Sequence, residues 1–210
     1  MNTVEIVKKY EGVLEMVSLD QFKNLHQNDV GGINKLVSRI DTVEVTDAGV
    51  LVTFEKKFPQ KEIFLAFDGS GYRVSRQGKS RNFRSETSEG HKRIQIQGLP
   101  VSVERFIAIA YDVAMNQMAS DYTGLVCNVT DGSGNMHTAS LLGIQPDYHF
   151  DNLEWCTKPE NLVHGSVILP LYKRTGHVYR FSYTKVGIIS LKLNDPTIKT
   201  WCRGNLHQVK

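Results

Sequence analysis

The first clear pattern of apolar residues lies near the N-terminus. Ser18 precedes it and Gln21 follows three positions later, which is the spacing of a helix capping box. Gly31 and Gly32 interrupt the pattern, and residues 33–40 then repeat apolar side chains at helical spacing. This stretch predicts two short helices separated by a glycine break.

A β-hairpin is predicted directly after these helices. Residues 43–45 and 50–54 are rich in β-branched and aromatic side chains, and residues 47–49 between them form a glycine-containing turn. Residues 58–72 then carry one proline and two glycines (Pro59, Gly69 and Gly71), which predicts a module boundary. We therefore expect residues 1–66 to form a small α+β module.

A buried helix is predicted from Pro100 to Tyr111, where apolar residues recur at helical spacing. Glu104 lies at the start of this helix and is expected at the surface. Short β signals mixed with basic residues precede the helix over residues 72–96. The middle of the chain therefore combines short strands with one well-defined helix.

Further short strands are predicted beyond this helix. Two β-like runs within residues 122–142 flank a turn at residues 131–135, and residues 152–157 form another short strand. Pro159 can occupy the first turn of a following helix.

The pattern of the C-terminal residues predicts a helix-turn-helix. Residues 186–193 form the first predicted helix and residues 197–203 the second, which begins after Asp195-Pro196. Four polar or basic side chains of the second helix would face outward toward phosphates and base edges. They are Thr197, Lys199, Thr200 and Arg203.

Composition indicates an ordinary soluble globular protein. Of the 210 residues, 40% are hydrophobic and 22% are charged, which excludes a disordered chain. No apolar run has the length of a membrane helix, and the N-terminus lacks a signal-peptide core. The three cysteines, Cys127, Cys156 and Cys202, are expected to be buried reduced thiols of a cytoplasmic protein.

The net charge of +3 is unevenly distributed. Residues 166–210 contain eight basic residues and one acid, and residues 72–93 contain seven basic residues and two acids. Basic surfaces gain affinity for nucleic acid by releasing counterions from its phosphates, so both segments predict DNA contacts. The expected contacts in the first segment are Arg73, Arg76, Lys79, Arg81 and Arg84.

Three stretches of the sequence carry recognisable motifs, namely Tyr72–Ser75 with Gly78 and Arg81, Val103–Tyr111, and Asn152–Thr157 followed by Pro159, Glu160, Asn161 and His164. Together they resemble the phage-type HNH homing endonucleases. The third stretch is the most specific. The resemblance implies an α+β fold with a ββα-metal (HNH-like) central domain at residues 67–165. The small module at 1–66 and the helix-turn-helix module at 166–210 would flank it.

The family's site implies roles for several residues. Asn152 matches the Asn that orients the catalytic base. Asn161 matches the metal-binding helix position, and His164 or Asp131 would complete a site for Mg²⁺ or another divalent metal. The implied partner is double-stranded DNA, with no membrane involvement.

The catalytic base is where the sequence departs from the family. The position of the family's first-strand His falls on Asn128 or Val129, neither of which can act as a base. A second register places the base at His137, and His149 is a third candidate. Either the base is displaced to His137 and the protein is a metal-dependent endonuclease or nickase, or the site is inactive. In the second case it is a DNA-binding protein of phage origin, or a host-interaction protein acting through residues 1–66.

Overall fold

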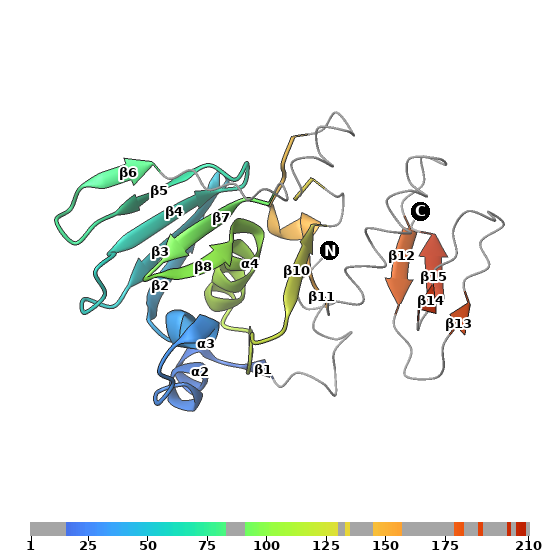
Figure 1. Ribbon diagram of the computed structural model, residues 1–210, viewed down its shortest axis with the longest axis horizontal. Helices are drawn as coiled ribbons and strands as arrows, with labels where there is room; N and C mark the ends of the chain where they lie inside the picture. Colours follow the sequence, from blue (N-terminus) through green and yellow to red (C-terminus); the bar gives the residue numbers. More distant parts are fainter. Residues whose placement is uncertain are drawn as a thin grey trace. The chain divides into compact units, whose positions relative to one another are not determined.

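The computed structural model describes the following parts of the chain (Figure 1). They are residues 16–82, 91–129, 133–134 and 145–156, with strand segments at 179–182, 189–190, 201–202 and 205–208. The chain divides into two compact units. The first comprises Met1–Thr123 and Cys127–Trp155, and the second comprises Gly124–Val126 and Cys156–Lys210. The fold is mixed α+β, as predicted, with few helices and several small sheets among the described residues.

A five-stranded antiparallel sheet is the largest element of the first unit, and its strands follow one another in chain order. Val50, Val52, Ile63 and Leu65 are each at most 1% exposed. They alternate with half-exposed residues because successive side chains of a strand point to opposite faces. The strands are β2 (Ile40–Val45), β3 (Gly49–Phe54), β4 (Glu62–Ala66), β5 (Gly71–Val74) and β6 (Ser80–Asn82).

The hairpin predicted between β2 and β3 is confirmed. Val45 pairs with Val50, and the Thr46 hydroxyl accepts a hydrogen bond from the Gly49 backbone N–H at 3.2 Å. A Cβ at position 49 would overlap the carbonyl oxygen of Leu65 on the neighbouring strand β4. This position therefore requires glycine.

The module boundary predicted after residue 66 is wrong. Phe64 on β4 pairs with Tyr72 on β5, so one sheet continues across the boundary. The connecting turn is held by Asp68, whose carboxylate accepts hydrogen bonds from the Ser70 hydroxyl at 2.6 Å and the Ser70 N–H at 2.7 Å. These bonds lower the pKa of Asp68. Glycine and short polar residues mark tight turns as well as linkers, and here they mark a turn.

One helix and one hairpin cover one face of the sheet (Figure 1). The helix is α4 (Val103–Ala114), and the hairpin joins β7 (Arg93–Ile96) to β8 (Leu99–Ser102). Phe106 of α4 is fully buried and stacks on Phe54 of β3, with ring centroids 6.4 Å apart. The buried helix predicted from its apolar spacing is confirmed.

Glu104 is not at the surface, and that expectation is wrong. It lies in the first turn of α4 and is 6% exposed. Its Oε1 is 3.9 Å from Nδ1 of His91, and burial raises the pKa of Glu104 to about 7. The error has a physical reason: Val103 and Phe106 orient α4 so that its first turn also packs inward.

Two short helices complete the N-terminal part, on either side of the predicted glycine break. Helix α2 (Leu19–Leu25) begins with the predicted capping box, in which Ser18 Oγ accepts from the Gln21 N–H and Gln21 Oε1 from the Ser18 N–H. Helix α3 (Gly32–Val37) follows. Strand β1 (Met16–Val17) pairs with β9 (Met118–Ala119), which ties the beginning of α2 to the segment after α4.

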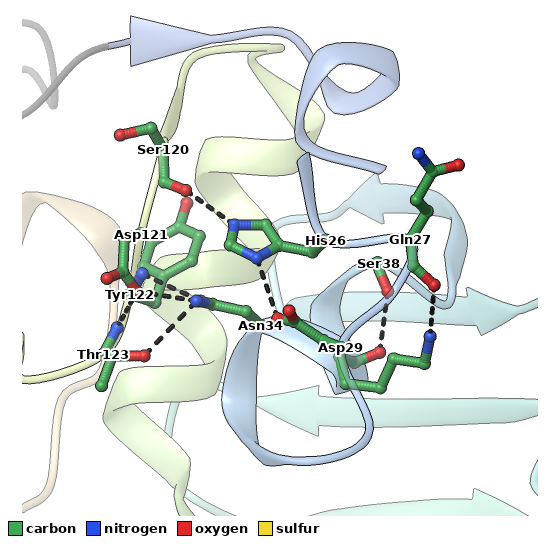
Figure 2. Close-up of polar contacts among 10 residues, drawn as sticks. His26, Gln27, Asp29, Asn34, Ser38, Ser120, Asp121, Tyr122 and Thr123 are labelled. Carbon is green, nitrogen blue, oxygen red and sulfur yellow. Dashed lines mark hydrogen bonds and ion pairs between the residues drawn. The ribbon is translucent and has the colours of Figure 1, made fainter. Parts of the chain in front are cut away.

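A polar network joins α3 to the segment after β9 (Figure 2). The Asn34 side chain is 7% exposed and accepts a hydrogen bond from the Tyr122 N–H at 3.0 Å. Its amide group donates to Asp121 at 2.7 Å and to Thr123 at 3.3 Å. His26 contributes a second link, with its Nε2 2.7 Å from the Ser120 carbonyl oxygen. These bonds fix the helices to the remainder of the first unit.

Strands β10 (Val126–Val129) and β11 (Leu153–Cys156) form a separate two-stranded sheet. A 3₁₀ turn, η1 (Phe150–Asn152), leads directly into β11. The prediction of a strand at 152–157 is confirmed for Leu153–Cys156. The side chain of Cys127 on β10 is buried, as expected.

The helix-turn-helix prediction is wrong for the C-terminal residues that the structure describes. Strand β13 (Ile189–Ser190) lies where the first helix was expected and pairs with β14 (Trp201–Cys202), where the second was expected. Strand β12 (Tyr179–Ser182) pairs with β15 (Asn205–Gln208). β-Branched and aromatic residues such as Ile189 and Trp201 favour strands, and this preference prevails over the helical spacing.

Within the described part of the chain, no helix is long and apolar enough to span a membrane.

Candidate nucleic-acid interface

The β5–β6 hairpin gathers the basic residues that the sequence predicts to contact DNA. Residues 71–82 contain four cationic side chains and no acid. Its turn is closed by two backbone bonds, from the Ser75 N–H to the Lys79 carbonyl and from the Gly78 N–H to the Ser75 carbonyl. Gly78 has φ of +75°, which explains a glycine there. Arg76 and Lys79 are exposed on this turn.

An open groove of about 350 Å³ lies beside the hairpin and is lined by Arg73 and Arg76. Arg73 is fixed by a hydrogen bond to the Gln95 carbonyl of β7 at 3.2 Å, so its position is set by two strands. Gln60 also lines the groove, and its buried Oε1 has no hydrogen-bond partner among the residues that the structure describes. The remaining lining residues are Pro59, Ser75 and Gln77. Two guanidinium groups beside an open groove suit an anionic polymer.

The β10–β11 sheet contains no base at the positions where the family's His would fall. Asn128 is 7% exposed and Val129 is 5% exposed. The Asn128 amide donates to Glu154 Oε1 on β11 at 2.8 Å, which joins the two strands through their side chains. Asn128 therefore has a structural partner, and an amide cannot accept a proton from water at neutral pH.

Asn152 holds the loop that leads into β11. Its side-chain amide donates to the Asp147 carbonyl at 2.8 Å, and Asp147 Oδ1 accepts from the His149 N–H at 2.9 Å. The His149 ring lies against Phe67 at 4.9 Å, with Nδ1 3.5 Å from the Asp151 carboxylate. The role that the family resemblance implies for Asn152, orienting a catalytic base, stays a prediction.

Several predicted site residues lie outside the described residues. For Arg81 the structure describes the backbone alone, with its Cα opposite that of Arg73. No group of three or more His, Cys, Asp or Glu that could hold a metal occurs in the part of the chain that the structure describes. The predicted residues outside it are Asp131, His137, Asn161, His164, Arg84, Thr197, Lys199, Thr200 and Arg203.

No protein-family model, curated protein or solved structure matches this chain. The HNH resemblance therefore rests on its motif residues alone, and function has to be inferred from the geometry.

Sequence reasoning missed a buried carboxyl that links α4 to β11. Asp112 is 1% exposed, and its Oδ2 accepts hydrogen bonds from the Tyr122 hydroxyl at 2.8 Å and the Trp155 Nε1–H at 3.0 Å. Burial raises the pKa of Asp112 to about 7. Its position three residues after Ile109, on the apolar side of the helix, was the available signal. Gln60 was also missed, because a single Gln in a turn carries no pattern.

Proposed function

We propose that this chain is a DNA-binding protein that contacts the phosphate backbone through its β5–β6 hairpin. The observation that carries the proposal is the acid-free hairpin, whose Arg73 and Arg76 line one open groove. The eight basic residues of segment 166–210 would supply a second contact. Such binding requires no recognised sequence, because phosphates are the same in every duplex.

Binding without cleavage is the favoured form of this proposal. At the family's base position the chain has Asn128, which bonds Glu154, and Val129, which is apolar. A strand with these residues supports DNA binding on an HNH-like scaffold better than hydrolysis.

Neutralising Arg76 and Lys79 together should weaken duplex binding and reduce its salt dependence. Each lost phosphate contact lowers the slope of log K against log salt by about 0.9. For Arg76→Gln with Lys79→Gln we therefore expect the slope to fall by about 2 in a fluorescence anisotropy titration of a short duplex.

The matched control changes the same net charge elsewhere. Lys23→Gln with Lys35→Gln removes two cations from α2 and α3, where Lys23 faces Glu55 and Lys35 bonds the Gln27 carbonyl. This control should keep the wild-type slope. Equal slopes for the wild type and the hairpin variant would refute the hairpin as a DNA contact.

A metal-dependent nickase is the second candidate, favoured by the bond from Asn152 to the loop carbonyl of Asp147. In this form His137 is the base, and Asn161 with His164 or Asp131 holds a divalent metal. The metal would supply charge stabilisation at the phosphate, and Asn152 would keep the loop in place.

Supercoiled plasmid incubated with Mg²⁺ or Mn²⁺ tests the second candidate. If it is correct, the wild type nicks the plasmid, and both His137→Ala and Asn161→Ala abolish nicking. His149→Ala, in the third candidate base, should leave nicking intact. Salt-sensitive plasmid binding without nicking would instead support the binding protein.

A further inference from the structure

The outer face of the five-stranded sheet carries an aromatic pair that the DNA-binding proposal does not use. Register places Leu51, Phe64 and Tyr72 opposite one another on adjacent strands, and residues paired in this way share one face. Their neighbours Val52 and Ile63 point to the opposite, buried face. The aromatic pair therefore lies on the face away from the core.

The two rings form a stacked surface. The Phe64 and Tyr72 centroids are 5.4 Å apart, with an angle of 22° between the ring planes. Tyr72 is 36% exposed and Phe64 is half-buried. An aromatic ring fixed by a neighbour and open to solvent is the arrangement on which nucleobases stack, because every base presents an apolar π-face.

The charge of the same hairpin indicates which partner would cover this surface. Arg76 and Lys79 follow Tyr72 by four and seven residues, on the exposed turn of the β5–β6 hairpin. The hairpin itself has no acidic residue, and Glu62 of β4, opposite Val74, is an acid on the same face of the sheet. A stacked aromatic pair with exposed cations four and seven residues further along the same hairpin suits an unpaired base together with its flanking phosphates better than it suits an apolar protein segment.

We propose that Phe64 and Tyr72 form a stacking platform for an unpaired nucleobase, with Arg76 and Lys79 contacting the adjacent phosphates. The ligand class is single-stranded nucleic acid, either DNA or RNA. This inference shares the hairpin cations with the proposed function, but it requires neither duplex binding nor cleavage. It adds a preference for nucleic acid whose bases are exposed.

Titration with single strands of equal length tests the platform. Labelled thymidine and uridine homopolymers distinguish DNA from RNA, and a duplex of the same length serves as a comparison. Tyr72→Ala should weaken binding to at least one single strand by about 10-fold, within the range for loss of one stacking residue. Duplex affinity should change by less than about 2-fold, because paired bases do not reach the ring.

Two further variants separate stacking from general damage. Tyr72→Phe keeps the ring and should retain single-strand affinity. Val45→Ala removes an apolar side chain of nearly equal exposure, 37%, from β2 at the other edge of the sheet, and should have no effect. The platform would be overturned if Tyr72→Ala lowered the affinity for duplex and single strand equally. It would also be overturned if Tyr72→Ala left the affinity for both single strands unchanged.

A fluorescent reporter gives an independent readout. Tyr72→Trp should lose fluorescence on addition of the single strand that binds, and should keep it with an abasic strand of the same length and charge. Quenching by the abasic strand as well would refute base stacking. If the Arg76 and Lys79 variant leaves duplex binding unchanged while Tyr72→Ala loses single-strand binding, the proposed function fails and the platform stands. If the Arg76 and Lys79 variant weakens duplex binding while Tyr72→Ala leaves single-strand binding unchanged, the proposed function stands and the platform is refuted.

Discussion

Replacing Asp112 with asparagine should make the free energy of unfolding less sensitive to pH between about 5 and 7. Burial raises the pKa of Asp112 from 3.8 to about 7, so the folded protein keeps a proton that the unfolded chain releases. The free energy of unfolding therefore falls as the pH rises toward 7. One such group contributes up to about 1.4 kcal/mol per pH unit, and the fall ends above the folded pKa.

Glu104 produces a slope of the same sign, because burial also raises its pKa to about 7. Urea unfolding at several pH values should show that Asp112→Asn removes about half of the slope and Glu104→Gln the rest. Asparagine still offers an acceptor to Tyr122 and Trp155. Asp112→Ala removes that acceptor, leaves two buried donors unpaired, and should lower the free energy of unfolding by about 3 kcal/mol at pH 5. An unchanged slope in Asp112→Asn would contradict this explanation.

Replacing Asn34 with alanine should lower the free energy of unfolding by about 3 kcal/mol. The side chain makes three hydrogen bonds from α3 to residues 121–123 and is almost fully buried. Each bond contributes about 1 kcal/mol, and the Tyr122 N–H would lose its partner. Urea or thermal unfolding monitored by circular dichroism measures the change.

Two variants on α3 and its cap provide the controls for Asn34. Ser38 is as buried as Asn34, and its hydroxyl donates a hydrogen bond to the nearby Lys35 carbonyl, so Ser38→Ala should lower the free energy of unfolding by about 1 kcal/mol or less. Asn34→Asp places a second carboxylate beside Asp121. The free energy of unfolding of this variant should therefore be lower at pH 7 than at pH 4. If Ser38→Ala and Asn34→Ala cost the same, the network of Figure 2 does not provide the stability assigned to it.

Local patterns predicted the elements whose signals lie within a few residues. The capping box at Ser18 and the apolar spacing of α4 are of this kind, and both are confirmed. The glycine and proline signals around β4 led to the wrong prediction of a module boundary, because they could not show that β4 pairs on both sides. Pairing depends on residues distant in sequence, which periodicity does not report.

The candidate site was predictable only where its residues form a local pattern in the sequence. Charge counting found Arg73 and Arg76, and the structure places both in one groove. It could not find Gln60, which reaches the groove from the turn before β4, or Asp112, whose partners lie on other elements. The β13–β14 pair shows the limit of helical spacing in a short segment rich in strand-forming residues.

The order of the strands has a consequence for how the first unit folds. Strands β2 to β6 pair with their neighbours in sequence, whereas β1 joins Met16 to Ala119 across about 100 residues. Pairing between neighbours closes short loops and costs little chain entropy, so the sheet is the part that can form early. We expect the β1–β9 pair and the Asn34 bonds, which close long loops, to form later. Contacts made after the rate-limiting step slow unfolding without accelerating folding, so we expect these N-terminal links to lengthen the lifetime of the folded state.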